Sequence, residues 1–193
     1  MKYGLIALLV VSAILVCGVC GGGCMLYSSY KTTISLDEDV KAKWADVEVD
    51  LQRRYELIPN LVSTVKGYAG HEKGILESVV QSREKYFSAS GPQAKQEASA
   101  GMERALSRLL VLQERYPELK ADSQFQNLAV NLEGSENRIA EKRRRFNDAV
   151  RELNSHIRGP IGSIAAGWAD VERAEFFEME AAAKDAPKVE FGS

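Results

Sequence analysis

Cysteine, histidine and unbalanced charge are all scarce in this chain of 193 residues. Its three cysteines lie before residue 25, and its two histidines are His71 and His156. The 25 basic residues nearly balance the 27 acids, so a net charge of −2 gives no argument for a nucleic-acid partner. The sequence has no Gly-x-Ser-x-Gly elbow, no Gly-rich phosphate loop and no second histidine to complete a zinc motif after His71. We therefore expect no enzymatic activity, no catalytic residue, no cofactor and no metal.

The N-terminal segment has no charge over residues 4–27 and is rich in Leu, Val and Ile. As a helix at ~1.5 Å per residue it would span roughly 36 Å, enough to cross a hydrocarbon core of about 30 Å. It also lacks an Ala-x-Ala-like cleavage site. These features predict a transmembrane anchor over residues 1–30, in contact with membrane lipid. A lipoprotein signal ending at Cys24 is the alternative, but Gly21 stands where lipid attachment prefers Leu.

Small residues line one face of this segment. They are Cys17, Gly18, Cys20, Gly21, Gly22 and Cys24. Such a stripe allows two membrane helices to approach closely, so we expect a homo-oligomer through this Cys/Gly face. No histidine or acid lies in the segment to complete a metal site with the cysteines.

Beyond residue 31, residues suited to a core recur at gaps of three and four, as in coiled-coil packing. They occupy positions 40, 44, 47, 51, 55, 58, 62, 65, 69, 72, 76, 79, 83 and 86. A capping box at Ser35 and Glu38 precedes this pattern. Because the phase continues across Pro59, it predicts one kinked helix over residues 36–87. Its expected core comprises Val40, Trp44, Val47, Leu51, Ile58, Val62, Val65, Leu76 and Val79.

Turn signals divide the rest of the chain. Residues 88–92 predict a turn, and Tyr116-Pro117 ends a second helix at about residue 115. A capping box at Ser123 and Gln126 opens a third helix, which Gly159-Pro160 ends. A short helix follows within residues 161–171. The prediction is an all-α antiparallel bundle of three long helices and a short C-terminal helix over residues 31–183, followed by a disordered tail at 184–193.

The segment around Pro59 is the candidate functional site. A proline inside a helix costs ~3 kcal/mol or more, and strain of this kind often accompanies function. The candidate docking or kink residues are Gln52, Arg53, Arg54, Pro59 and Asn60. In one interpretation both arginines pair with acids on a neighbouring helix, while an amide of Asn60 or Gln52 binds the carbonyl freed by Pro59. In the other, the segment is a docking surface for a protein partner. Both interpretations remain open.

Two further features favour structural roles. The four side chains of the basic run at residues 142–145 point in different directions around more than one helical turn, and therefore they cannot form a flat patch. Acids at 136, 141 and 148 are spaced to pair with it. His71 and His156 fall near core positions of their predicted helices, where a hydrogen-bonded structural histidine is the more frequent occupant.

The block Gln-Arg-Arg-Tyr-Glu-Leu-Ile-Pro-Asn-Leu-Val at residues 52–62 resembles the LemA family of bacterial membrane proteins. Blocks at residues 116–121 and 136–150 agree in order and spacing. The chain departs from the family at Arg145, where an aromatic residue is usual, and at Gly159, where a Phe-Pro pair is usual. The resemblance implies an N-terminal membrane helix and an antiparallel helical domain. It implies no agreed catalytic activity.

We therefore expect a single-pass protein of the bacterial inner membrane that acts as an adaptor or scaffold through an unknown protein partner. The alternatives are an accessory or regulatory subunit of a membrane protease or envelope enzyme and, more weakly, a lipid-anchored envelope protein. Because the terminal amine and Lys2 precede the span, we expect the N-terminus inside and the bundle outside the cytoplasm.

Overall fold

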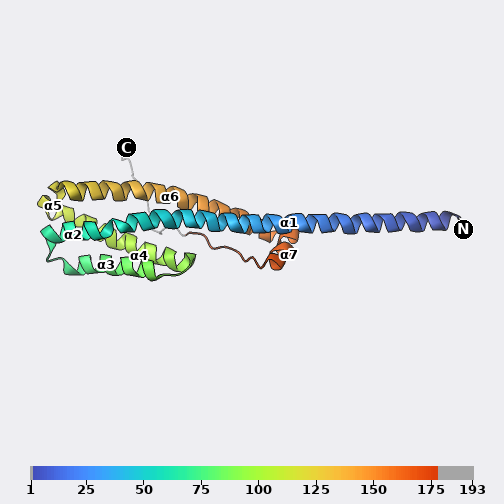
Figure 1. Ribbon diagram of the computed structural model, residues 1–193, viewed down its shortest axis with the longest axis horizontal. Helices are drawn as coiled ribbons and strands as arrows, with labels where there is room; N and C mark the ends of the chain where they lie inside the picture. The colour runs from blue at the N-terminus through green and yellow to red at the C-terminus, as the bar shows by residue number, and fades with distance from the viewer. Residues whose placement is uncertain (1, 178–193) are drawn as a thin grey trace, which may run out of the picture. The chain divides into compact units, whose positions relative to one another are not determined.

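The computed structural model describes the backbone of residues 2–177 and the side chains of residues 17, 18 and 20–177. Within this part of the chain all regular structure is helical, which confirms the all-α prediction (Figure 1). The elements are α1 (Lys2–Glu56), α2 (Ile58–Ala69), α3 (Lys73–Ser88), α4 (Pro92–Leu110), the 3-10 helix η1 (Val111–Glu114), α5 (Pro117–Ala121), α6 (Ser123–Arg158) and α7 (Pro160–Ala169).

Helix α1 runs without interruption through the predicted capping box at Ser35 and Glu38, so the predicted helix start there is wrong. The acids of this stretch bind lysines of the same helix instead, with Lys41 Nζ 2.7 Å from Asp37 and 3.0 Å from Glu38. A capping box begins a helix only where the backbone amides lack helical partners, and here the preceding turn of α1 supplies those partners.

Within the residues whose side chains the structure describes, no helix is both long enough and apolar enough to cross a membrane. The predicted anchor at residues 1–30 rests mostly on residues 1–16 and 19, which lie outside the described side chains. The predicted tail at 184–193 also lies outside the described residues.

The predicted single helix over residues 36–87 is wrong. The chain leaves helical hydrogen bonding at Leu57 and reverses direction between α2 and α3, at residues 70–72. The bundle therefore has four long segments where three were predicted. The apolar phase continues across the reversal because both α2 and α3 bury that phase in the same core. Periodicity reports which face is buried but not the direction of the chain.

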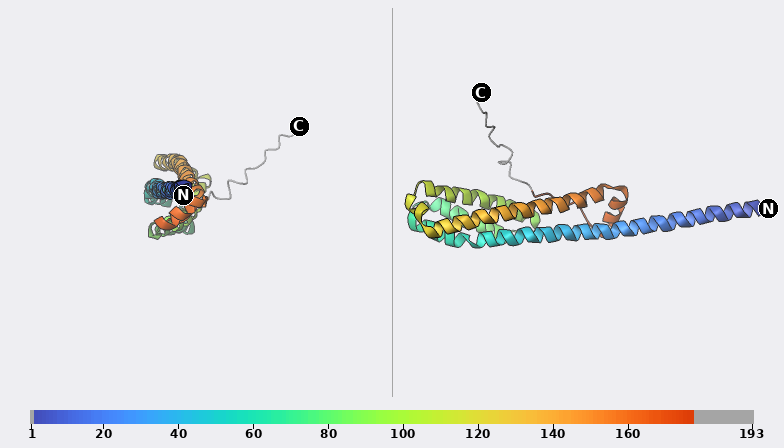
Figure 2. Two further views of the ribbon diagram at one scale, coloured as in Figure 1. Left: turned by 90° about the vertical axis from the view of Figure 1, so that its right-hand side faces the viewer. Right: turned by 90° about the horizontal axis from the view of Figure 1, so that it is seen from above.

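The chain forms two compact units, and α1 and α6 contribute to both. Unit 2 comprises residues 44–146 together with 176–193, of which 176 and 177 are described. Within it the end of α1 with α2, then α3, α4 and the first part of α6 run alternately up and down (Figures 1 and 2). Trp44 packs edge-on against Phe146, with ring centroids 5.5 Å apart. Eight of the nine predicted core residues of the first segment are buried, while Leu61 is buried in place of Val62, which is half-buried.

Short connections in unit 2 follow the local chemistry. Gly91 has φ 82°, a left-handed conformation that suits glycine, and Pro92 then begins α4. Asp122, rather than the predicted Ser123, caps α6, because its Oδ1 accepts a 2.8 Å hydrogen bond from the amide of Phe125. That bond is the main cause that lowers the pKa of Asp122.

Unit 1 comprises Met1–Lys43 and Asn147–Glu175, and it contains the predicted short C-terminal helix as α7. Gly162 of α7 packs so closely on the end of α6 that a Cβ atom would lie 1.9 Å from the carbonyl oxygen of His156. The segment after α7 is held by Asn154, whose amide donates to the Ala174 carbonyl at 2.8 Å and accepts from the Ala174 amide at 3.0 Å.

Leu132 and Ile139 test the core assignment of α6, since each is only 1% exposed. Replacing either with Ala should lower the free energy of unfolding by about 2–5 kcal/mol in urea titrations followed by circular dichroism. The control is Val130→Ala on the same helix. Because Val130 is 67% exposed, its replacement should change stability by less than about 0.5 kcal/mol. Equal effects at the three positions would contradict the assignment.

Candidate functional site

The five predicted site residues do not share one environment. Gln52, Arg53, Pro59 and Asn60 are exposed, whereas Arg54 is 6% exposed and points into unit 2. Gln52 donates to Glu56 of its own helix at 3.2 Å, and Arg53 lies 3.9 Å from Asp50, also on α1. The junction of α1 and α2 thus has an outer surface of four residues, called here the junction surface (Gln52, Arg53, Pro59 and Asn60), and an inner side anchored by Arg54.

Pro59 leaves the carbonyl of Tyr55 without its helical donor, because Tyr55 lies four residues earlier and proline has no N–H. Neither predicted amide, that of Asn60 or that of Gln52, binds this carbonyl. Arg83 of α3 does so, donating from Nε to the Tyr55 oxygen at 3.1 Å. The proline is thereby accommodated by a side chain from another helix.

Arg54 pairs with acids on two other helices, as one interpretation of the sequence anticipated. Its Nη2 donates to Glu136 of α6 at 3.4 Å, and its Nη1 lies 3.9 Å from Glu103 of α4, an ionic contact too long for a hydrogen bond. Glu103 is held more tightly by Arg143 of α6, at 2.5 Å. Together Arg54, Glu103, Glu136 and Arg143 form an ion cluster that joins α1, α4 and α6.

Two buried tyrosines lie beside this ion cluster. Tyr55 and Tyr86 are at most 1% exposed, and their rings meet edge-on with centroids 4.6 Å apart. Neither hydroxyl has a hydrogen-bond partner among the described residues. Burial raises the pKa of Tyr86 to about 12, with a further contribution from the charge of Glu48, which is paired with Lys95. Burial also raises the pKa of Tyr55, assisted by the charge of Glu103.

Every residue of the basic run at 142–145 is paired, as predicted, but of the three predicted acids only Glu141 takes part. Glu136 binds Arg54 and Asp148 binds Arg151 instead. Lys142 binds Asp46 of α1 at 2.8 Å, and Arg143 binds Glu103. Arg144 and Arg145 bind Glu141 on their own helix, at 3.1 and 3.0 Å. The run therefore connects helices within unit 2 and presents no free basic patch.

The histidines differ from each other. His71 is exposed in the turn between α2 and α3, so its predicted place near a helix core is wrong. His156 is hydrogen-bonded as predicted, with Nε2 3.0 Å from Thr33 Oγ1 and 3.3 Å from Ser29 Oγ. The Thr33 hydroxyl donates its one proton to the Ser29 carbonyl at 2.9 Å. Its oxygen must then accept from His156, which assigns the ring proton to Nε2.

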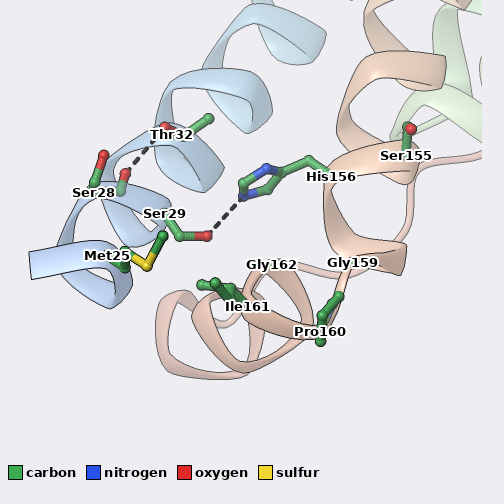
Figure 3. A pocket seen from close by; sticks show the side chains of 10 residues that line it. All are labelled: Met25, Ser28, Ser29, Thr32, Ser155, His156, Gly159, Pro160, Ile161 and Gly162. Carbon is green, nitrogen blue, oxygen red and sulfur yellow. Dashed lines mark hydrogen bonds between the residues drawn. The ribbon is translucent and has the colours of Figure 1, made fainter. Parts of the chain in front are cut away.

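An open pocket of about 490 Å³ surrounds this histidine in unit 1. Figure 3 shows the imidazole reaching from α6 toward Ser29 of α1, with Ile161 and Gly162 of α7 beside it.

Cys17, Cys20 and Cys24 are exposed on α1. Within the described residues no group of histidines, cysteines and acids could hold a metal ion.

Sequence patterns missed the polar groups that organise the inner side of the junction. One signal was available, because Arg83 falls at position 83 of the core repeat and a charged residue there needs a special partner. Glu103 carries no comparable signal, since its importance depends on Arg54 and Arg143 from distant parts of the chain.

The fold and the site define an all-helical protein in which ion pairs around the buried Arg54 join helices to one another. The model of the LemA family matches residues 43–191, and the chain belongs to this family. Its curated relatives include the magnetosome proteins MamQ 1 and MamQ 2 of Paramagnetospirillum magneticum and the magnetosome protein MamQ of Magnetospirillum gryphiswaldense. Each is 27% identical over 188 residues, which cover 84% of this chain and 69% of the relative.

Arg83 and Pro59 should be energetically coupled. Arg83→Met should lower the free energy of unfolding by about 1–3 kcal/mol, because the Tyr55 carbonyl then lacks a donor. In a Pro59→Ala background the new amide can donate to that carbonyl, so the same change should cost at least about 1 kcal/mol less. The contact of Arg83 with the Phe87 ring, at 4.7 Å, is lost in both backgrounds and cancels. Urea unfolding of the four variants measures the coupling, and strictly additive costs would contradict it.

Tyr86 should make stability fall at alkaline pH. Its pKa is raised from 10.0 to about 12, so between these values the unfolded chain loses a proton that the folded chain retains. The contribution of Tyr86 to the free energy of unfolding is thus fully present below pH 10. It falls by about 1.4 kcal/mol per pH unit as the pH rises toward 12. Tyr86→Phe should remove this part of the fall and, because it deletes an unpaired hydroxyl, should cost little at neutral pH. Urea titrations of both proteins across this range provide the measurement, and parallel curves would refute the assignment.

Proposed function

We propose that the chain is a single-pass membrane protein that acts as an adaptor or scaffold, without catalysis of its own, and that the junction surface is where a protein partner docks. The observation that carries the proposal is the division of the α1–α2 junction into two sides. Gln52, Arg53, Pro59 and Asn60 face solvent, while Arg54 and Arg83 hold the backbone beneath them from inside.

A surface built this way suits docking. Its backbone is tied to α3, α4 and α6 through Arg83, Glu103 and Glu136, so little conformational entropy is lost when a partner binds. Exposed arginine is also common among residues that dominate protein interfaces, because its guanidinium can donate several hydrogen bonds at once. The ion pair of Arg53 with Asp50, at 3.9 Å, is loose and can be exchanged for a partner's carboxylate.

Membrane anchoring is supported by the uncharged, Leu-, Val- and Ile-rich residues 4–27 and by membership of the LemA family. The terminal amine and Lys2 favour an N-terminus inside and a bundle outside the cytoplasm of a bacterial inner membrane. A second copy is proposed to pack on the Cys/Gly face, where Cys17, Cys20 and Cys24 are exposed. Oxidative cross-linking through Cys20 tests that contact.

Two alternative functions use different parts of the chain. An accessory subunit of a membrane protease or envelope enzyme would bind its enzyme at the junction surface and change its rate. A lipid-anchored envelope protein would use Cys24 as the attachment point in place of the apolar span. The relatives named above are magnetosome proteins, and we take this association with a bacterial structure as support for the scaffold function.

The test is cross-linking in cells with a permeabilised outer layer, using a reagent that cannot cross the inner membrane. An Arg53→Glu, Asn60→Ala double variant should yield at least about tenfold less cross-linked partner than the natural chain, because it reverses a charge on the junction surface. Its thermal unfolding should be unchanged, since both side chains are exposed.

The matched control is Arg108→Glu, which reverses an exposed charge on α4 and should retain the partner. If the double variant retained it too, the junction surface would not be the docking site. Absence of cross-links from the natural chain, together with their appearance when a permeant reagent is used, would reverse the proposed orientation. A captured enzyme whose rate responds to this chain would favour the accessory-subunit function.

A further inference from the structure

Helix α7 presents its large apolar side chains outward. Ile161, Ile164 and Trp168 are 37%, 49% and 64% exposed, and at about 100° per residue they fall within about 60° of the helix circumference. A neighbouring side of the helix, formed by Gly162, Ala165 and Ala166, is buried. Among the described residues, helix α7 therefore buries its small residues and leaves its largest apolar ones as an uncovered hydrophobic face.

This face lies beside the part of α1 where the uncharged segment ends. Ile161 and Gly162 line the same pocket as Met25 and Ser29, and Figure 3 shows Met25 next to Ile161. All of these residues belong to unit 1. Two residues beyond Met25, the exposed Tyr27 carries Lys31 over its ring, with Nζ 4.9 Å from the centroid. A tyrosine and a lysine at the end of an apolar span are the usual residues of a membrane–water interface.

We propose that the exposed face of α7 binds the membrane surface, with Ile161, Ile164 and Trp168 embedded among the lipid headgroups. The proposal rests on the membrane anchor proposed above, and it adds a second lipid contact from a distant part of the chain. Residues 160–169 contain no charge, so no ionised group opposes entry into the interface. Tryptophan is the residue most enriched at this depth, where its ring is in an apolar layer and its N–H reaches water.

The observations favour lipid over a second copy of the chain or another protein. The face is short and consists of three side chains, which is small for a stable protein interface of about 800 Å² per partner. Ile161 lines the same pocket as Met25, which places the start of α7 at the level where the span at residues 4–27 must leave the hydrocarbon. An interfacial helix inserts its apolar face only about 5–10 Å, a depth that these side chains can reach.

The test uses Trp168 as its own reporter in the full chain, reconstituted in vesicles of phosphatidylcholine and phosphatidylglycerol. Phosphatidylcholine brominated near the headgroup end of its acyl chains should quench tryptophan emission more strongly than phosphatidylcholine brominated near the chain ends. The difference should vanish in Trp168→Phe, where Trp44 is the remaining tryptophan and is buried in unit 2. Ile164→Asn should weaken the quenching several-fold, while Val130→Asn, at an even more exposed apolar position on α6, should not change it.

The outcomes separate this proposal from the anchor. A chain that floats with the vesicles but shows the same quenching with and without Trp168 keeps its anchor and overturns the lipid contact of α7. Stronger quenching from the deep label also overturns the interfacial placement. A blue-shifted, unquenched Trp168 whose emission depends on the chain-to-lipid ratio would assign the face to a second copy. A chain that fails to float overturns the anchor and the α7 contact together.

Discussion

Two groups enclosed by the helices of unit 2, the Tyr55 carbonyl and the Arg54 guanidinium, bind partners on other helices, and this requirement constrains how those helices meet. Pro59 deprives the Tyr55 carbonyl of its helical donor, and Arg83 of α3 replaces it. Arg54 enters the same interior and is met by Glu103 of α4 and Glu136 of α6. A buried charge without a partner costs about 3–5 kcal/mol, so packing registers that separate these groups are strongly disfavoured.

The same constraint gives the α1–α2 junction its two-sided character. Arginines that are neighbours in sequence, Arg53 and Arg54, point to solvent and to the interior because successive helical residues lie about 100° apart. Arg54 makes the junction a fixed part of the bundle, and Arg53 remains available at its surface. The outer surface is thus preorganised by contacts that no docking partner needs to touch. Structural and docking interpretations of this segment therefore apply to different residues and do not compete.

Unit 1 uses close packing of small residues in place of buried charge. Gly162 contacts the His156 carbonyl and so allows α7 to lie against the end of α6. Any larger residue at position 162 would prevent this close approach. The alanines of α7 continue this buried side, which leaves Ile161, Ile164 and Trp168 facing outward. His156 contributes to the same packing through Ser29 and Thr33. Helix α7 thus packs through its small residues, and its large apolar side chains are free to contact a second apolar surface.

Sequence by itself determined what depends on local chemistry and periodicity. Residues such as Trp44, Leu51, Val65 and Val79 are buried where the repeat placed them, and Pro92 begins a helix after the predicted turn. Hydrophobic spacing specifies a buried face, and proline specifies where a helix can start, with no reference to the rest of the chain.

Chain direction and polar partners were decided by tertiary structure. Spacing could not reveal the reversal at residues 70–72, because α2 and α3 share one core and therefore one phase. Nor could local sequence identify Arg83 as the donor for Tyr55, 28 positions away, or Asp46 as the partner of Lys142, 96 positions away. Such pairs exist only once the helices have packed, because residues so far apart in the sequence meet only in the folded chain.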